Sequence, residues 1–143
     1  MAGRDKVGEK ELIERLRRVP LFSNVSTKNL RTVVRLGKQL SWAEGKEGVV
    51  QGSRSHAFYL ILDGGVEVTR DGKPVARLHT NDFFGEAGMI SGGERNASVT
   101  ATTPSDFFVL SRSGFAGALK SNQDLALQLM SAMVERQPSG SSY

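Results

Sequence analysis

Hydrophobic positions at the start of the chain follow a helical repeat. Residues 9–19 place apolar side chains three or four positions apart, and Pro20 ends this run. A second short helix is predicted over residues 27–36, with Ser26 suited to its N-terminal cap and Gly37 to its C-terminal stop. The pattern therefore predicts two short helices ahead of the central part of the chain.

From about residue 38 the spacing of apolar positions changes from the helical repeat to two. Alternating or continuously apolar segments predict strands at residues 39–43, 47–51, 57–63, 65–70, 74–79, 98–102 and 106–110. Turn-forming residues separate them, and Asp71-Gly72 is the clearest hairpin signal because a type I′ turn needs positive φ. Many short strands at this spacing are typical of an antiparallel barrel or jelly roll.

The helical repeat returns after Leu110. One short helix is predicted over residues 113–120, and a longer one follows, with Ser121 as its cap and Asp124 as the partner of that cap. The longer helix should end near Pro138. Its expected apolar stripe, facing the barrel, consists of Ala126, Leu129, Met130, Met133 and Val134.

The predicted fold class is α+β and mainly β. It is an antiparallel β-roll or jelly-roll barrel, flanked by N-terminal helices and a C-terminal helix pair. A single domain is expected over residues 9–137, with a flexible N-terminus at residues 1–8 and a flexible tail at residues 138–143.

Composition narrows the function classes. The chain has 143 residues and no cysteine, which excludes disulfides and thiolate metal sites. No apolar run approaches the roughly 20 residues that span a bilayer. No secretory signal is recognised, so a cytoplasmic location and no membrane partner are expected.

The net charge of +4 raises the question of nucleic-acid binding. The arginines at 15, 17 and 18 alternate with Glu11 and Glu14, which is the pattern of a solvated helix face. No aromatic residues lie among the basic ones to provide a stacking surface. Direct contact with nucleic acid is therefore not expected.

One stretch, FGEAGMISGGERNASV at residues 84–99, has the composition of an anion site. Residues 87–91 have room for one helical turn, whose first amides attract anions. Gly85 allows close approach to the backbone, and the guanidinium of Arg95 matches phosphate oxygens. A carboxylate at Glu86 would repel phosphate unless it faced a donor such as a sugar hydroxyl. The combination indicates a nucleotide whose phosphate and ribose lie close together.

The order Phe84-Gly85-Glu86, small and apolar residues, a glycine-containing turn, and then Arg95-x-Ala97-Ser98-Val99 resembles the phosphate-binding cassette of the cyclic nucleotide-binding domain family. That family includes catabolite activator protein, the regulatory subunit of protein kinase A and cyclic-nucleotide-gated channels. Residues 19–22 resemble its entry segment and residues 58–68 its central hairpin. The resemblance covers about residues 10–137.

The resemblance implies roles for the residues of this cassette. Glu86 would bind the ribose 2′-hydroxyl and Arg95 the cyclic phosphate, while backbone amides and the Ser98 hydroxyl or amide would complete the phosphate site. A residue in the region 130–136 would close over the purine. The predicted ligand-binding residues are Gly85, Glu86, Ala87, Arg95, Asn96, Ala97 and Ser98.

Three positions depart from the family pattern. Gly88 stands where the family often has alanine, and Ala87 where a larger apolar residue is common. Asn96 follows the arginine where alanine, serine or threonine is usual, which leaves the choice between cAMP and cGMP open. The last helix stops at Pro138, so a base-covering group farther along is missing unless the tail folds over.

Several of these residues also suit functions other than ligand binding. Glu86 and Arg95 alone would suit a weak surface ion pair. His56 and His79 raise a metal-binding cupin as a third candidate, but they lie 23 positions apart without further ligands at metal spacing, so no metal is expected. Trp42, Phe107 and Phe108 are expected in the core.

The leading hypothesis is a cyclic nucleotide sensor, for cAMP or alternatively cGMP, with no enzymatic activity and no cofactor. Binding would shift the population of the C-terminal helices, which would repack against the barrel through Leu129, Met130 and Met133. The alternative is a degenerate relative that binds no nucleotide and acts as an interaction or dimerisation module. An effector protein, a fused domain and a homodimer formed through the C-terminal helix are the partners left open.

Overall fold

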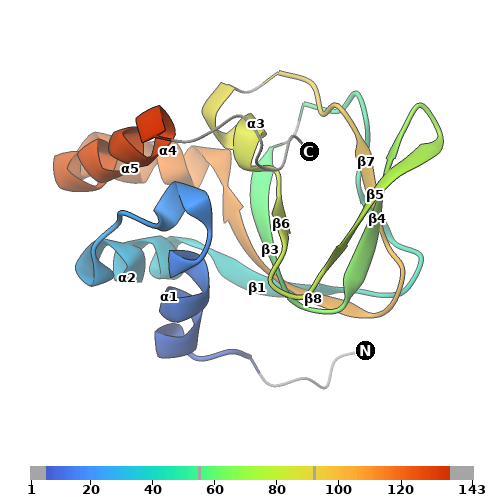
Figure 1. Cartoon of the computed structure of the whole chain (residues 1–143), viewed down its shortest axis with the longest axis horizontal. Helices are drawn as coiled ribbons and strands as arrows, with labels where there is room; N and C mark the ends of the chain where they lie inside the picture. The colour runs from blue at the N-terminus through green and yellow to red at the C-terminus, as the bar shows by residue number, and fades with distance from the viewer. Residues whose placement is uncertain (1–5, 55, 92, 136–143) are drawn as a thin grey trace.

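A computed structural model describes residues 6–54, 56–91 and 93–135 (Figure 1). The elements in chain order are α1 (Glu9–Arg17), the 3₁₀ turn η1 (Pro20–Phe22), α2 (Thr27–Leu36), β1 (Lys38–Trp42), β2 (Glu47–Val49), β3 (Ala57–Asp63), β4 (Gly65–Arg70), β5 (Lys73–His79), β6 (Phe83–Phe84), α3 (Glu86–Ser91), β7 (Ser98–Ala101), β8 (Ser105–Ser111), α4 (Arg112–Ser121) and α5 (Gln123–Glu135). The fold class predicted from the sequence is confirmed: an antiparallel β-roll carries helices at both ends of the chain.

The strands of the described residues form two four-stranded antiparallel sheets. One has the order β1-β8-β3-β6 and the other β2-β7-β4-β5. In Figure 1 the helices gather on the side of the β1-β8-β3-β6 sheet, while the second sheet lies on the far side of the roll. The short strand β6, which leads into α3, was not predicted from the sequence because two residues carry no detectable repeat.

Alternation along β3 divides the interior into two cores. Phe58, Leu60 and Leu62 point to one face of the strand and pack with the helices, whereas Ile61 points into the roll beside Phe107. The predicted core residue Trp42 is buried in the roll, and Phe108 is buried in the helical core. Because one strand serves both cores, a displacement of the helices acts directly on a strand that also lines the roll.

The predicted β4–β5 hairpin is confirmed. Asp71 has φ of 54° and Gly72 has φ of 79°, the two positive values that a type I′ turn requires. The pairing of Arg70 with Lys73 closes the hairpin directly across this turn.

Helix α2 begins as predicted, but the reason for a glycine at position 37, directly after the helix, differs from the prediction. The Ser26 hydroxyl accepts a hydrogen bond from the amide of Asn29 at 3.3 Å. Gly37 has extended backbone, with φ of −91° and ψ of −178°, and is not a left-handed cap. A Cβ at this position would lie 2.8 Å from the carbonyl oxygen of Val109 and would overlap the ring of Phe108. Glycine is therefore needed for packing of the chain against β8.

The predicted cap of the last helix was wrong by one residue. The side chain of Asn122 caps α5 by accepting a hydrogen bond from the amide of Leu125 at 3.0 Å. Ser121 ends α4, and its hydroxyl donates to the carbonyl oxygens of Gly117 and Ala118. Asp124 instead accepts a hydrogen bond from the side chain of Asn29 on α2.

The face of α5 that is buried also differs from the prediction. Leu129 is buried as predicted, but together with Leu125 it enters the core that α5 shares with η1 and the other helices rather than facing the roll. Ala126 is half-buried, and Met130, expected to pack, is 57% exposed beside the equally exposed Leu127. The side chains of Met133 and Val134 and the tail at 138–143 lie outside what the structure describes. Apolar residues at positions 125–127, 129 and 130 lie on more than one side of α5, so their spacing alone does not select the buried face.

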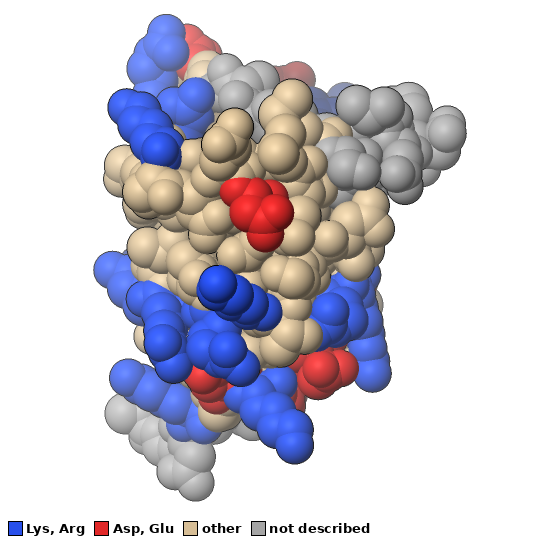
Figure 2. Space-filling model, turned by 90° about the vertical axis from the view of Figure 1, so that its left-hand side faces the viewer, with Lys and Arg blue, Asp and Glu red and all other residues tan. Residues whose placement is uncertain are grey.

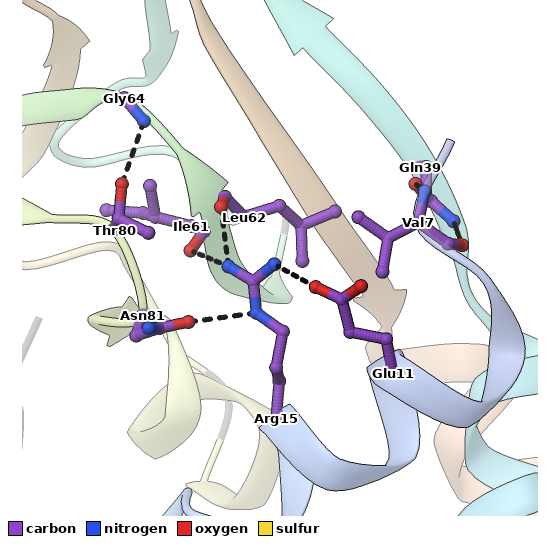
Figure 3. Close-up of polar contacts among 9 residues, drawn as sticks. All are labelled: Val7, Glu11, Arg15, Gln39, Ile61, Leu62, Gly64, Thr80 and Asn81. Carbon is purple, nitrogen blue, oxygen red and sulfur yellow. Dashed lines mark hydrogen bonds and ion pairs between the residues drawn. The ribbon is translucent and has the colours of Figure 1, made fainter. Parts of the chain in front are cut away.

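Arg15 fastens α1 to the roll (Figure 3). Its guanidinium donates hydrogen bonds to the carbonyl oxygens of Ile61 and Leu62 on β3 and to the side chain of Asn81 at 2.9 Å. Asn81, with φ of 74°, lies in the turn between β5 and β6.

Figure 3 also shows Gln39 pairing with both backbone groups of Val7, which lies within the N-terminal segment expected to be flexible. The five residues before Lys6 lie outside the described part.

Basic side chains gather over the lower half of the face shown in Figure 2 and again at its upper left, while the surface between them is largely uncharged apart from an acidic side chain. Ion pairs of the described helices join Arg15 with Glu11, Arg17 with Glu14, and Arg35 with Glu9. A hydrogen bond from Arg35 lowers the pKa of Glu9. Such exposed pairs contribute little to stability. None of the described helices is both long and apolar enough to cross a bilayer.

Candidate functional site

Arg95 lies at the centre of the candidate site, immediately before β7. Its backbone is fixed to the loop between β2 and β3, because its amide donates to Ser53 at 2.7 Å and its carbonyl accepts from Gly52 at 2.8 Å. The side chain is only 6% exposed. It lines a cavity of about 130 Å³ together with Gly48, Val49, Val50, Ser53, Ala57 and Tyr59.

Burial sets the electrostatics of this cavity. Desolvation lowers the pKa of the Arg95 guanidinium, and the neighbouring Tyr59 acts in the opposite direction. Desolvation also raises the pKa of the Tyr59 hydroxyl, opposed by the charge of Arg95. An arginine starts from a pKa so high that it remains charged at neutral pH, and Tyr59 remains protonated. The cavity therefore presents a positive charge and a phenolic hydroxyl beside apolar walls.

Gly85 lies against Arg95. It has φ of 86°, and a Cβ at this position would overlap the carbonyl oxygen of Ala57 and lie 3.5 Å from Nη1 of Arg95. Its carbonyl accepts a hydrogen bond from the amide of Met89, which forms the first turn of α3. The predicted short helix is thus present as α3, and the backbone at its start lies next to the guanidinium.

Glu86 is fully buried at the first position of α3. It follows Gly85 directly, but it is not among the residues that line the 130 Å³ cavity. Burial of a carboxylate is costly unless it is compensated. The predicted ligand residue Glu86 therefore lies outside the lining of the cavity.

The other predicted ligand residues differ in their surroundings. Asn96 is exposed, and its carbonyl accepts a hydrogen bond from Arg70 at 2.9 Å. Ala97 is buried inside the roll. The Ser98 hydroxyl accepts from the amide of Gln51 at 2.8 Å, which leaves its proton available for donation. For Ala87, within α3, the structure gives no side-chain surroundings.

Two residues of the site were not identified from the sequence. Tyr59 occupies the roll-facing side of β3 and stacks on Phe84, with ring centroids 4.7 Å apart. His56 lies just before β3, and its Nδ1 is 3.3 Å from Nη1 of Arg95. Alternation could have assigned Tyr59 to the roll interior, but no sequence pattern connects positions 56 and 95.

The two histidines do not come together in a metal site. His79 is exposed at the end of β5, whereas His56 contacts Arg95. No group of three or more potential metal ligands occurs among the residues that the structure describes.

Comparison with known families gives one match over more than half of the chain. A family model described as "Cyclic nucleotide-binding domain" matches residues 40–122. The matched segment begins in β1, ends after α4 and includes the whole cassette.

Two individual relatives are similar to parts of this chain. An uncharacterised protein of Mycobacterium tuberculosis is 41% identical over 69 residues, covering 48% of this chain and 14% of the relative. The cAMP-dependent protein kinase regulatory subunit of Yarrowia lipolytica is 30% identical over 102 residues, covering 70% of this chain and 27% of the relative. This chain thus spans only about a seventh to a quarter of the length of these relatives.

Solved structures show the same fold. A cyclic nucleotide-binding domain from Methylobacillus flagellatus superposes with a TM-score of 0.76 at 25% identity, covering 89% of this chain and 74% of the other. The agreement extends over the helices as well as the roll.

Proposed function

Because the chain belongs to the cyclic nucleotide-binding domain family, we propose that it is a receptor that binds cAMP through its cassette and performs no chemistry on it. The observation that carries the proposal is the placement of the buried Arg95 guanidinium in a cavity beside Gly85. A positive group taken out of water at this position gains most from an anionic ligand that replaces the lost hydration.

The size of the cavity suggests how the ligand lies. Sites that enclose a whole small molecule usually exceed about 300 Å³. The 130 Å³ cavity is smaller, so we place the cyclic phosphate in it, against Arg95 and the start of α3. The resemblance assigns the ribose 2′-hydroxyl to Glu86, which is fully buried and does not line the cavity here, so this contact requires a shift of α3. The purine would lie outside the cavity. The Ser98 hydroxyl retains a proton to donate toward the phosphate.

Calorimetric titration of the 143-residue chain with cAMP, and separately with cGMP, tests this function. We expect saturable binding with a micromolar dissociation constant, tighter for cAMP, and no turnover of the nucleotide after prolonged incubation. Absence of heat with both nucleotides up to millimolar concentration would contradict the proposal and support the degenerate, non-binding interaction module. Preference for cGMP would overturn the choice of ligand while leaving the receptor function intact.

The proposal includes a relay through the C-terminal helices. In the present structure α5 is held to α2 by the buried Asn29, whose side chain donates to Asp124 and Gln128 at 3.0 and 3.1 Å. Leu127 and Met130 remain exposed on α5 and are available to cover a ligand. We infer that nucleotide binding favours release of α5 from α2, and that an effector protein or fused domain responds to this shift.

Asn29→Ala is expected to tighten cAMP binding two- to fivefold while it lowers the melting temperature. The change removes the side chain that holds α5 against α2. Release of α5 then requires less free energy, so cAMP binding becomes more favourable. Calorimetry and thermal unfolding measure the two effects, with the exposed Asn24→Ala as control. A variant that melts earlier but binds cAMP with unchanged affinity would show that α5 is not coupled to the site.

A further inference from the structure

We propose that His56 is a positioning residue that makes the anion cavity sensitive to pH: its neutral ring holds the guanidinium of Arg95 in place, and protonation of the ring releases it. The inference rests on the proposed function in so far as the anion is a cyclic nucleotide. It does not follow from membership of the family, because it depends on a histidine and a glycine of this particular chain, His56 and Gly88.

The contacts of the imidazole allow only one protonation state. An arginine side chain donates hydrogen bonds and cannot accept them. The contact of 3.3 Å between Nη1 of Arg95 and Nδ1 of His56 therefore requires a bare Nδ1 that accepts. The other ring nitrogen, Nε2, contacts the carbonyl oxygen of Gly93, which itself can only accept. A neutral ring that carries its proton on Nε2 satisfies both contacts, and a doubly protonated ring breaks the first.

Gly88 provides the space that this arrangement needs. A Cβ at position 88 would lie 2.8 Å from Cε1 of His56 and closer still to Nδ1. An alanine, as the family often has here, would push the ring away from Arg95. The missing methyl group in α3 and the histidine before β3 are thus complementary, and together they connect the cassette helix, the turn at Gly93 and the phosphate-binding arginine.

The charges around the ring determine whether protonation of His56 strengthens or weakens anion binding. Arg95 faces the ring directly, while Arg54 and Arg112 line a groove of about 600 Å³ on its other side. Glu86 lies two positions before Gly88 on α3 and is fully buried. His56 lines the groove but not the 130 Å³ cavity, so a protonated ring would not donate a hydrogen bond to a phosphate held there. Protonation instead places a second cation against Arg95 and removes its acceptor.

The groove also explains how protons reach the ring. Because the imidazole lines an open groove, it exchanges protons with solvent while its Nδ1 edge contacts the buried guanidinium. Histidine is the side chain that changes charge between about pH 5 and 8. Protonation of the ring is therefore transmitted to the cavity through Arg95.

Long-range ¹H–¹⁵N correlation spectra of the ligand-free chain test the geometry without any nucleotide. The chain has two histidines, so the His56 signals are identified by their loss in His56→Gln. We expect the proton on Nε2 and a bare Nδ1 at about pH 7.5. A ring protonated on Nδ1 at that pH overturns the proposal, whether or not the chain binds cAMP.

Calorimetric titration with cAMP at several pH values tests the consequence. Between about pH 7.5 and 5.5, affinity should fall about tenfold, the effect of losing one hydrogen bond to a charged group. The glutamine of His56→Gln can still accept a hydrogen bond from Arg95 and donate one to Gly93, but it does not titrate. The cAMP affinity of this variant should therefore change less than about twofold over the same pH range. His79→Gln, at the exposed histidine, should keep the pH dependence of the original chain.

The outcomes separate this inference from the proposed function. If the chain binds cAMP and His56→Gln keeps the full pH dependence, the inference fails while the receptor function stands. If affinity rises as the pH falls, the sign is wrong and the inference fails as well. If no cAMP binds at any pH, the proposed function fails, and the spectra alone decide the role of His56.

Discussion

Arg95→Ala is expected to weaken binding of cAMP by at least about 100-fold, the largest loss from any single side chain of this site. Truncating one partner of a desolvated charge pair typically costs 2–5 kcal/mol, and each 1.4 kcal/mol is about tenfold in affinity. Arg95 lies in the cavity at 6% exposure, so solvent cannot replace it. Titration calorimetry measures the loss, and a circular-dichroism melt shows that the variant is folded.

Two further variants sharpen this test. Arg95→Lys keeps the charge without the planar fork of donors, and we expect intermediate affinity. Arg77→Ala makes the same change in net charge at a side chain that is 68% exposed on β5, and it should bind as the original chain does. Equal affinities for Arg95→Ala and Arg77→Ala would mean that the phosphate lies elsewhere.

Gly85→Ala is expected to lower the free energy of unfolding by about 3 kcal/mol or more and to remove most nucleotide binding. A positive φ costs a residue with a Cβ about 1–2 kcal/mol, and overlap with packed neighbours adds a further 1–3 kcal/mol. Here the overlap is with the carbonyl oxygen of Ala57, part of a strand that cannot easily yield. For a chain of this length, 3 kcal/mol corresponds to roughly 10 °C in melting temperature.

Gly45→Ala is a close control for this variant. Gly45 has φ of 88° against 86° for Gly85, but nothing lies within 4 Å of its Cβ position. The two substitutions share the backbone strain and differ in the overlap. Thermal unfolding should therefore show a clearly smaller loss for Gly45→Ala, with cAMP affinity unchanged. Similar losses in both variants would indicate that the contact with Ala57 is not what requires glycine at position 85.

Local patterns were sufficient for most of the secondary structure. Ser26 caps α2 as predicted, and Asp71-Gly72 forms the predicted turn, because both features depend on a few neighbouring residues. The predictions that failed involved a choice between similar local alternatives. Ser121 and Asn122 both have side chains that cap helices, and only the packing of α4 against α5 decided that Asn122 does so.

The residues of the candidate site also fall into two groups, those that local patterns predicted and those that only the folded structure brings together. Gly85, Glu86 and Arg95 could be predicted as candidates from the sequence, since their residue types and spacing fall within one continuous segment. His56 and Tyr59 were not identified, because they reach Arg95 only after β3 has paired with β6 and β8. The departure at Gly88 was visible in the sequence, but its cause, the ring of His56, was visible only in three dimensions.

The order and type of most elements, the class of fold and the candidate cassette could be predicted from the amino-acid pattern, because each depends on spacing along the chain. Tertiary structure alone decided which face of α5 is buried, why positions 37 and 88 are glycine, and which side chains surround Arg95. The physical reason is that a contact such as that between His56 and Arg95 joins positions 39 residues apart, and packing of the strands between them brings the two together.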